Sequence, residues 1–195
     1  MFDPKEFEYL TNTDFLQTKR RIIQKLFHQF SQLEHVISGQ IHRFPFIQSM
    51  PLRRGKVSKG ENYRELPYLV LDYPAVFKRE DIFSLRTIFW WGHEFSCTLH
   101  LQGKYKKRFE EKIIERIKTP EKHSNLQLCI HATPWEYYFE EDNYQSILEM
   151  DSKTLEQVIQ EKPFVKLACR LPLERFEELE AFVKESTQTL FALLK

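Results

Sequence analysis

The sequence predicts an α+β fold, in which an antiparallel sheet of about six strands carries helices on one face and a long N-terminal helix. Two observations predict this class. Residues 95–102 alternate between apolar and polar side chains without a fault, which is typical of a strand with two different faces. A basic segment with one apolar stripe follows almost at once, at residues 105–118, and indicates a helix that covers the apolar face.

The N-terminal region, residues 12–38, is predicted to be one long amphipathic helix. Its apolar residues recur at spacings of three, four and seven: Leu16, Ile23, Leu26, Phe30, Leu33 and Ile37. Thr11 or Thr13 can cap its start, and Gly39 can end it. Such a regular apolar seam is typical of helices that pair in a homodimer, although packing within one chain gives the same pattern.

Residues 43–65 are predicted to be irregular and basic. Prolines and glycines interrupt any period, and four cations lie close together: Arg53, Arg54, Lys56 and Lys59. Long segments without regular structure tend to be functional or mobile.

Three strands are predicted between residues 66 and 102, at 66–73, 85–91 and 95–102. The turn at Gly92 and His93 is short enough for a hairpin between the last two strands. Helix 105–118 closes this first half.

The second half is predicted to repeat this order, with strands at 126–132, 135–140 and 144–150. A helix at 153–161, a strand at 164–171 and a helix at 173–194 follow. Both terminal helices contain the string Arg-Phe-Glu-Glu, at residues 108–111 and 175–178. Internal duplication is one hypothesis, and a chance match of four common residues is the other. We expect residues 1–195 to form a single domain.

Composition limits the classes of protein that the chain can represent. The net charge of +1 gives no overall attraction to nucleic acid or anionic lipid, and 42% hydrophobic residues allow a real core. Seventeen Phe, eight Tyr and three Trp predict a ring-rich core or an aromatic-lined cavity. Three widely spaced cysteines, no signal peptide and no apolar run of eighteen residues favour a cytoplasmic protein without a membrane span.

The polar face of the predicted sheet is the candidate site. Side-chain alternation places Thr98 and His100 on this face, and the same parity in neighbouring strands adds His131 and Arg86. The remaining candidates are Asp72, Trp90 and Arg170. Imidazoles and cations on one face can bind a small anionic molecule or move protons. The alternative is a polar face that water covers, as antiparallel sheets often have.

Other chemistry finds little support in the sequence. His28, His35 and His42 follow a heptad, but 28 and 35 fall opposite the apolar seam, and about 10 Å separates successive members. No nucleophile elbow, phosphate-binding loop or dinucleotide fingerprint occurs, so we expect no metal and no cofactor.

Two classes of function stay open, with a third of lower weight. A non-catalytic binding or interaction domain is favoured, because no catalytic motif was found. An enzyme or sensor for an anionic ligand, acting near His100 and His131, is the alternative. Nucleic-acid binding through Arg53, Arg54, Lys56 and residues 104–108 is disfavoured by the near-neutral charge.

Overall fold

A computed structural model describes residues 1–52, 54–118 and 125–195. Within these ranges the chain forms six α-helices, one 3₁₀ helix and a seven-stranded antiparallel sheet. The helices are α1 (Pro4–Thr11), α2 (Thr13–Ile41), α3 (Pro45–Gln48), α4 (Lys104–Ile117), α5 (Ser152–Glu161), η2 (Leu173–Glu178) and α6 (Leu179–Ala192). The strands are β1 (Lys56–Tyr63), β2 (Leu66–Phe77), β3 (Ile82–Trp90), β4 (Glu94–Gln102), β5 (Gln127–Cys129), β6 (Tyr144–Ser146) and β7 (Phe164–Pro172). The predicted α+β class is confirmed.

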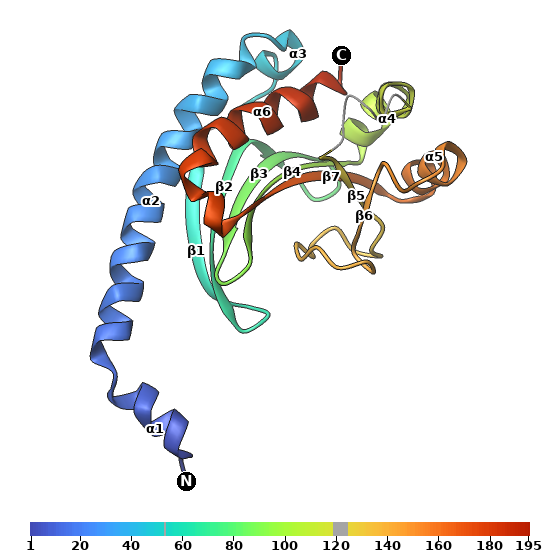
Figure 1. Cartoon of the computed structure of the whole chain (residues 1–195). Coiled ribbons are helices and arrows are strands. Elements are labelled where there is room, and N and C mark those ends of the chain that lie inside the picture. The colour runs from blue at the N-terminus through green and yellow to red at the C-terminus, as the bar shows by residue number, and fades with distance from the viewer. Residues whose placement is uncertain (53, 119–124) are drawn as a thin grey trace.

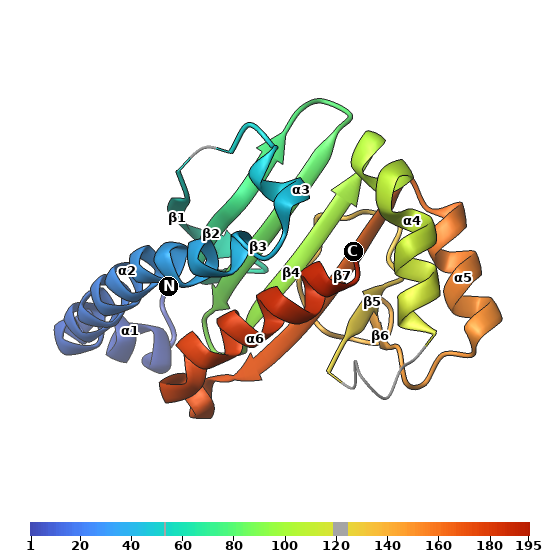
Figure 2. The same ribbon diagram turned by 90° about the horizontal axis from the view of Figure 1, so that it is seen from above.

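The sheet has the order β1-β2-β3-β4-β7-β5-β6, so β7 pairs with β4 although about sixty residues separate them. The sheet is curved like an arch, and α2, α4 and α6 lie on its outer face (Figure 1). Seen from above, α6 runs over β4 and β7 while α2 crosses toward β1 and β2 (Figure 2). The segment between β5 and β6 lies under the inner, concave face (Figure 1).

The core lies between the outer face and the helices. The apolar set of β4 points into it, and each of Phe95, Cys97, Leu99 and Leu101 is at most 1% exposed. Phe30 of α2 packs against Phe95, and α4 and α6 supply Phe109, Leu190 and Phe191. Each buried ring or branched chain contributes roughly 1.5–3 kcal/mol of apolar transfer free energy. The predicted direction of the β4 side chains is therefore confirmed.

The N-terminal helix differs from its predicted bounds. A capping box between Asp3 and Glu6 starts a separate helix, α1, and the side chain of Asn12 then caps α2 by accepting from the Phe15 amide at 2.9 Å. Gly39 does not end α2, which continues to Ile41. The buried residues of α2 begin at Leu26, Ile23 packs partly against the core, and Lys19 pairs with Glu61 of β1 at 2.6 Å. The first turns of α2 and all of α1 extend away from the body (Figure 1).

Three other predicted segments are corrected. The region predicted to be irregular contains α3 and the edge strand β1, and its Arg53 lies outside the described residues. The predicted strand 135–140 is wrong, because these residues form a non-regular segment under the sheet. The last helix begins as a 3₁₀ turn with a kink at Arg175.

The two halves of the chain differ in element order. Four hydrogen-bonded strands, β1 to β4, precede α4 in the first half, whereas β5, β6, α5 and β7 precede α6 in the second. Duplication stays a hypothesis. None of the helices within the described ranges combines the length and apolarity needed to cross a membrane.

Candidate functional site

The inner sheet face carries an ion pair between Asp72 of β2 and Arg86 of β3, which are direct cross-strand partners. The guanidinium binds the carboxylate through two bonds, Nε–Oδ1 at 2.7 Å and Nη2–Oδ2 at 2.8 Å. Its Nη1 donates to the Tyr137 hydroxyl at 2.7 Å. Burial acts to lower the pKa of Arg86, but the hydrogen bonds and charge of Asp72 outweigh it and raise that pKa. Arg86 is therefore a fixed cation.

Lys166 of β7 is a second cation on this face, and it is fully buried. Its ammonium donates to the backbone carbonyl of Glu136 and lies 3.9 Å from the centroid of the Tyr137 ring. No carboxylate of the described residues lies within 4 Å of it. Burial lowers the pKa of Lys166 to about 7, and the positive charge of Arg86 acts in the same direction. The charge of this lysine consequently changes near neutral pH.

His100 of β4 pairs directly with Lys166 across the two strands. Its ring is 2% exposed and lies edge-on to Trp135 and Phe164, with centroids 5.5 and 6.0 Å away. Among the described residues, none forms a hydrogen bond with its Nε2 atom. Burial, followed by the charges of Lys166 and Arg86, lowers the pKa of His100 to about 3. The imidazole is neutral at physiological pH and offers an unused polar atom.

Residues 130–143 lie below the sheet (Figure 1), and Lys166 donates to the Glu136 carbonyl and Arg86 to the Tyr137 hydroxyl of this segment. The Tyr63 hydroxyl accepts from the Tyr137 amide at 2.7 Å and donates to the Glu136 carboxylate at 3.0 Å, which ties the segment to β1. Asn143 donates its side-chain amide to the Tyr138 carbonyl at 2.6 Å. The cover is therefore held by specific bonds although it has no regular secondary structure.

A small cavity of about 190 Å³ opens between this cover and the sheet. Aromatic side chains make most of its wall, and Arg86 supplies the charge; the lining residues are Tyr63, Tyr68, Val70, Arg86, Ile88, Trp135 and Tyr137. Trp135 separates the cavity from His100 and is 49% exposed, so it is the least enclosed part of the wall.

The predicted site residues do not all come together. Asp72 and Arg86 form the ion pair, and Thr98 and His100 lie buried beside them on β4. The predicted alternative of a water-covered face is corrected, because Ser96, Thr98 and His100 are each at most 3% exposed.

Three other predicted residues lie around this centre. Trp90 is buried on the same face, where its indole donates to the Tyr63 carbonyl at 3.2 Å and stacks on His93. His131 contacts Tyr138, and within the described residues no hydrogen bond or ring contact joins it to His100. Arg170 is exposed and reaches Glu94 at 3.8 Å.

Sequence reasoning missed Tyr63, Trp135 and Tyr137 as site residues. For Trp135 and Tyr137 the signal was an unusual aromatic run at residues 135–139, directly after Pro134. Lys166, in contrast, alternates with Val165 and Leu167, and this parity places it on the polar face from the sequence alone. The parity of a strand identifies a face, but it does not identify which loop covers that face.

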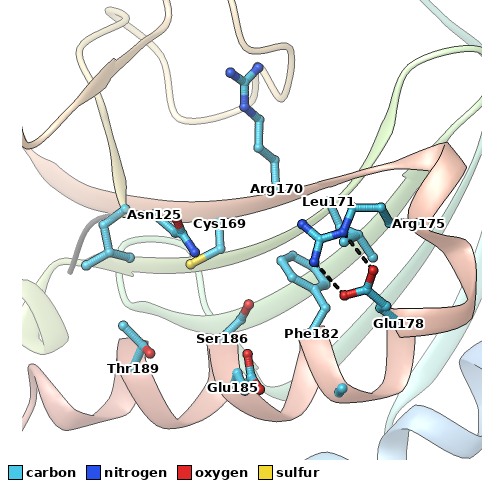
Figure 3. Close-up of a pocket in the computed structure, with 12 residues that line it drawn as sticks. Asn125, Cys169, Arg170, Leu171, Arg175, Glu178, Phe182, Glu185, Ser186 and Thr189 are labelled. Carbon is cyan, nitrogen blue, oxygen red and sulfur yellow. Dashed lines mark hydrogen bonds and ion pairs between the residues drawn. The ribbon is translucent and has the colours of Figure 1, made fainter. Parts of the chain in front are cut away.

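A second hollow, of about 200 Å³, lies on the outer side between β7 and α6. Figure 3 shows Cys169 and Ser186 facing it, with the Arg175–Glu178 ion pair at one end and Arg170 directed away. Burial raises the pKa of the Cys169 thiol to about 11, so this thiol is a poor nucleophile. The outer hollow therefore lacks an activated group.

Comparison with known protein families and with curated proteins found no match to this chain. Within the described residues, no group of three His, Cys, Asp or Glu side chains is placed to hold a metal ion. The chemistry of the inner face is thus the guide to function.

Proposed function

We propose that the protein is a non-catalytic binding domain that holds a small anionic molecule on the inner sheet face, beneath residues 130–143. The observation that carries this proposal is a buried cation without a carboxylate partner, Lys166, next to an imidazole nitrogen without any partner, His100 Nε2. Buried charges are costly unless they are paired, and such groups concentrate at functional sites.

The charges on this face favour an anion. Arg86 and Lys166 are cationic below neutral pH, whereas Asp72 is the carboxylate that neutralises one of them. The Glu136 side chain is directed to the Tyr63 hydroxyl instead. One negative group on a ligand would balance the remaining positive charge.

The cavity walls favour a small ligand with an apolar or aromatic body. A volume of about 190 Å³ is below that of typical drug-sized sites, which take about 300–1,000 Å³. The rings of Tyr63, Tyr68 and Tyr137 offer flat apolar surfaces, and rotation of Trp135 would join the cavity to His100.

Binding has more support than catalysis. His100 is neutral, and no described contact links it to a carboxylate or to His131 that would make it a proton shuttle. Burial also raises the pKa of the nearby Cys129 thiol. The nucleic-acid alternative is weakened because Lys106 is buried against Glu110 and Lys104 pairs with Asp81.

The test is calorimetric titration of the full chain with a panel of small aromatic and aliphatic carboxylates and phosphate monoesters. We expect Lys166→Met to weaken binding of the best ligand at least about tenfold, because a desolvated charge pair is lost. Arg170→Gln on the same strand is the matched control, since its side chain is exposed.

The pH dependence adds a second readout. Because an anion raises the pKa of Lys166 above about 7, binding takes up a proton, and affinity should fall as the pH rises from about 6 to about 8.5. The proposal would be contradicted if the affinity changed neither with pH nor in Lys166→Met, or if no member of the panel bound.

A further inference from the structure

The N-terminal arm, residues 1–27, exposes an unusual amount of apolar surface. Of twelve large hydrophobic residues that are exposed in the described chain, nine lie in this arm: Met1, Phe2, Phe7, Tyr9, Leu10, Phe15, Leu16, Ile22 and Phe27. No residue of α1 is buried, and the buried positions of α2 begin at Leu26. An exposed cluster of this kind marks an interaction surface.

The apolar stripe of α2 is continuous across the point where it leaves the body. Phe30, Leu33 and Ile37 are buried in the core, and Ile23, one heptad before Phe30, packs partly against it. Leu16, one heptad earlier still, is 58% exposed, so the apolar stripe continues past the part of the helix that the body covers.

An apolar groove of about 440 Å³ lies at the base of the arm. Its lining includes Ile22 and Leu26 of α2, Phe89 and Trp91 at the end of β3, and Leu173 and Phe176 of η2. The chain's own α1 extends away from the body (Figure 1) and supplies no residue to the lining of this groove. Because Ile22 and Leu26 line the groove, it adjoins the exposed apolar side chains of the arm.

The distribution of charge along the arm indicates which molecule could fill the groove. Residues 1–12 contain three acids (Asp3, Glu6 and Glu8) and one lysine, so their net charge is −2. Residues 13–25 contain four bases (Lys19, Arg20, Arg21 and Lys25) and one acid, so their net charge is +3. Lys19 already pairs with Glu61 of β1, and counting this carboxylate leaves +2. An antiparallel arrangement of two arms places acidic α1 beside the basic part of α2, whereas a parallel arrangement places like charges together.

We propose that two copies of this chain associate through their arms, antiparallel and two-fold symmetric, so that α1 of each copy fills the Trp91 groove of the other. Such an interface is isologous, with the same surface patch used by both copies. The arm has the size of one side of a standard interface, roughly 20–30 residues. Anionic lipid is a poorer occupant, because the acidic α1 would be repelled by it.

Sedimentation velocity of the full chain between about 1 and about 100 µM tests this proposal, with a dimer expected at the upper end. Leu16→Glu places a carboxylate in the interface of each copy and should raise the dissociation constant at least about tenfold. Leu148→Glu is the matched control, because this leucine is equally exposed but lies on the body. Circular dichroism would verify that both variants are folded.

Exchanging the charges of two residues tests how the two arms align with each other. Glu8→Lys and Lys25→Glu should each weaken the dimer, and the double variant should restore it to within about threefold of the natural chain. A chain that is monomeric throughout, a dimer that is insensitive to Leu16→Glu, or a double variant without recovery would overturn the proposal. So would a monomer that sediments with vesicles of phosphatidylcholine and phosphatidylglycerol.

Discussion

The two faces of β4 are equally buried but chemically opposite. On the outer face, Phe95, Cys97 and Leu99 pack under helices in the apolar core. On the inner face, Ser96, Thr98 and His100 lie under a segment without regular structure and bring polar atoms into the interior. Apolar burial stabilises the fold, whereas polar burial costs free energy unless each group is satisfied. The outer face therefore stabilises the fold, whereas the polar burial on the inner face is what supports the proposal of a binding site there.

The largest expected effect tests the outer face. Leu99→Ala removes a side chain with no exposed surface and should lower the free energy of unfolding by about 3 kcal/mol, as cavity-forming substitutions do. Thr98→Val, at the adjacent position on the inner face, keeps the side-chain volume and should change the free energy of unfolding by less than about 1 kcal/mol. Urea denaturation measures both changes. Equal losses in the free energy of unfolding would show that the two faces do not differ in their contribution to stability.

An intermediate effect tests the ion pair of the inner face. Asp72→Asn leaves the Arg86 guanidinium buried beside a neutral amide, and the free energy of unfolding should fall by about 2 kcal/mol. Glu178→Gln breaks the exposed pair with Arg175 and should cost less than about 0.5 kcal/mol in the same assay. A small effect at both positions would mean that the inner pair is solvated.

The smallest effect sharpens the role of Lys166. The pKa of Lys166 is about 7 in the folded protein and 10.5 in the unfolded chain. Below pH 7 the ligand-free protein therefore carries a buried charge that lowers its stability, and this free-energy cost decreases as the pH rises. Lys166→Met should therefore gain stability relative to the natural chain at pH 6, by about 1–2 kcal/mol more than it does at pH 8. Thermal and urea unfolding at both pH values measure this difference. A gain that is the same at both pH values would show that Lys166 is not neutral in the folded state at pH 8.

Much of the fold could be predicted because apolar periodicity reports burial directly. The alternation in 95–102 identified β4 and its two faces, and the stripe in 105–118 identified α4. Strand β1 was missed because an edge strand is mostly exposed and needs no apolar pattern; Gly60 within it lies where a Cβ atom would meet the Tyr68 ring at 2.4–2.6 Å. Aromatic residues at 135–139 favoured a strand by propensity, yet their rings pack under the sheet from a segment outside it.

The candidate site was only partly predictable. Parity placed Asp72, Arg86 and His100 on one face, because neighbouring strands stay in register. It could not join His131 to them, since β5 ends at Cys129 and the chain then leaves the sheet. The contacts of Tyr137 and Trp135 depend on the path of a long connection, which no local period encodes.

The position of β7 has a consequence for synthesis of the chain. All nine residues of β4 pair with β7, whose first residue, Phe164, is made about sixty residues after the last residue of β4. Until then, one side of β4 presents a row of amide and carbonyl groups that invites pairing with other chains. A ribosome that stalls between these two strands would hold an open sheet edge, so the emerging chain is most prone to aggregate there and becomes protected only after Pro172 has left the exit tunnel.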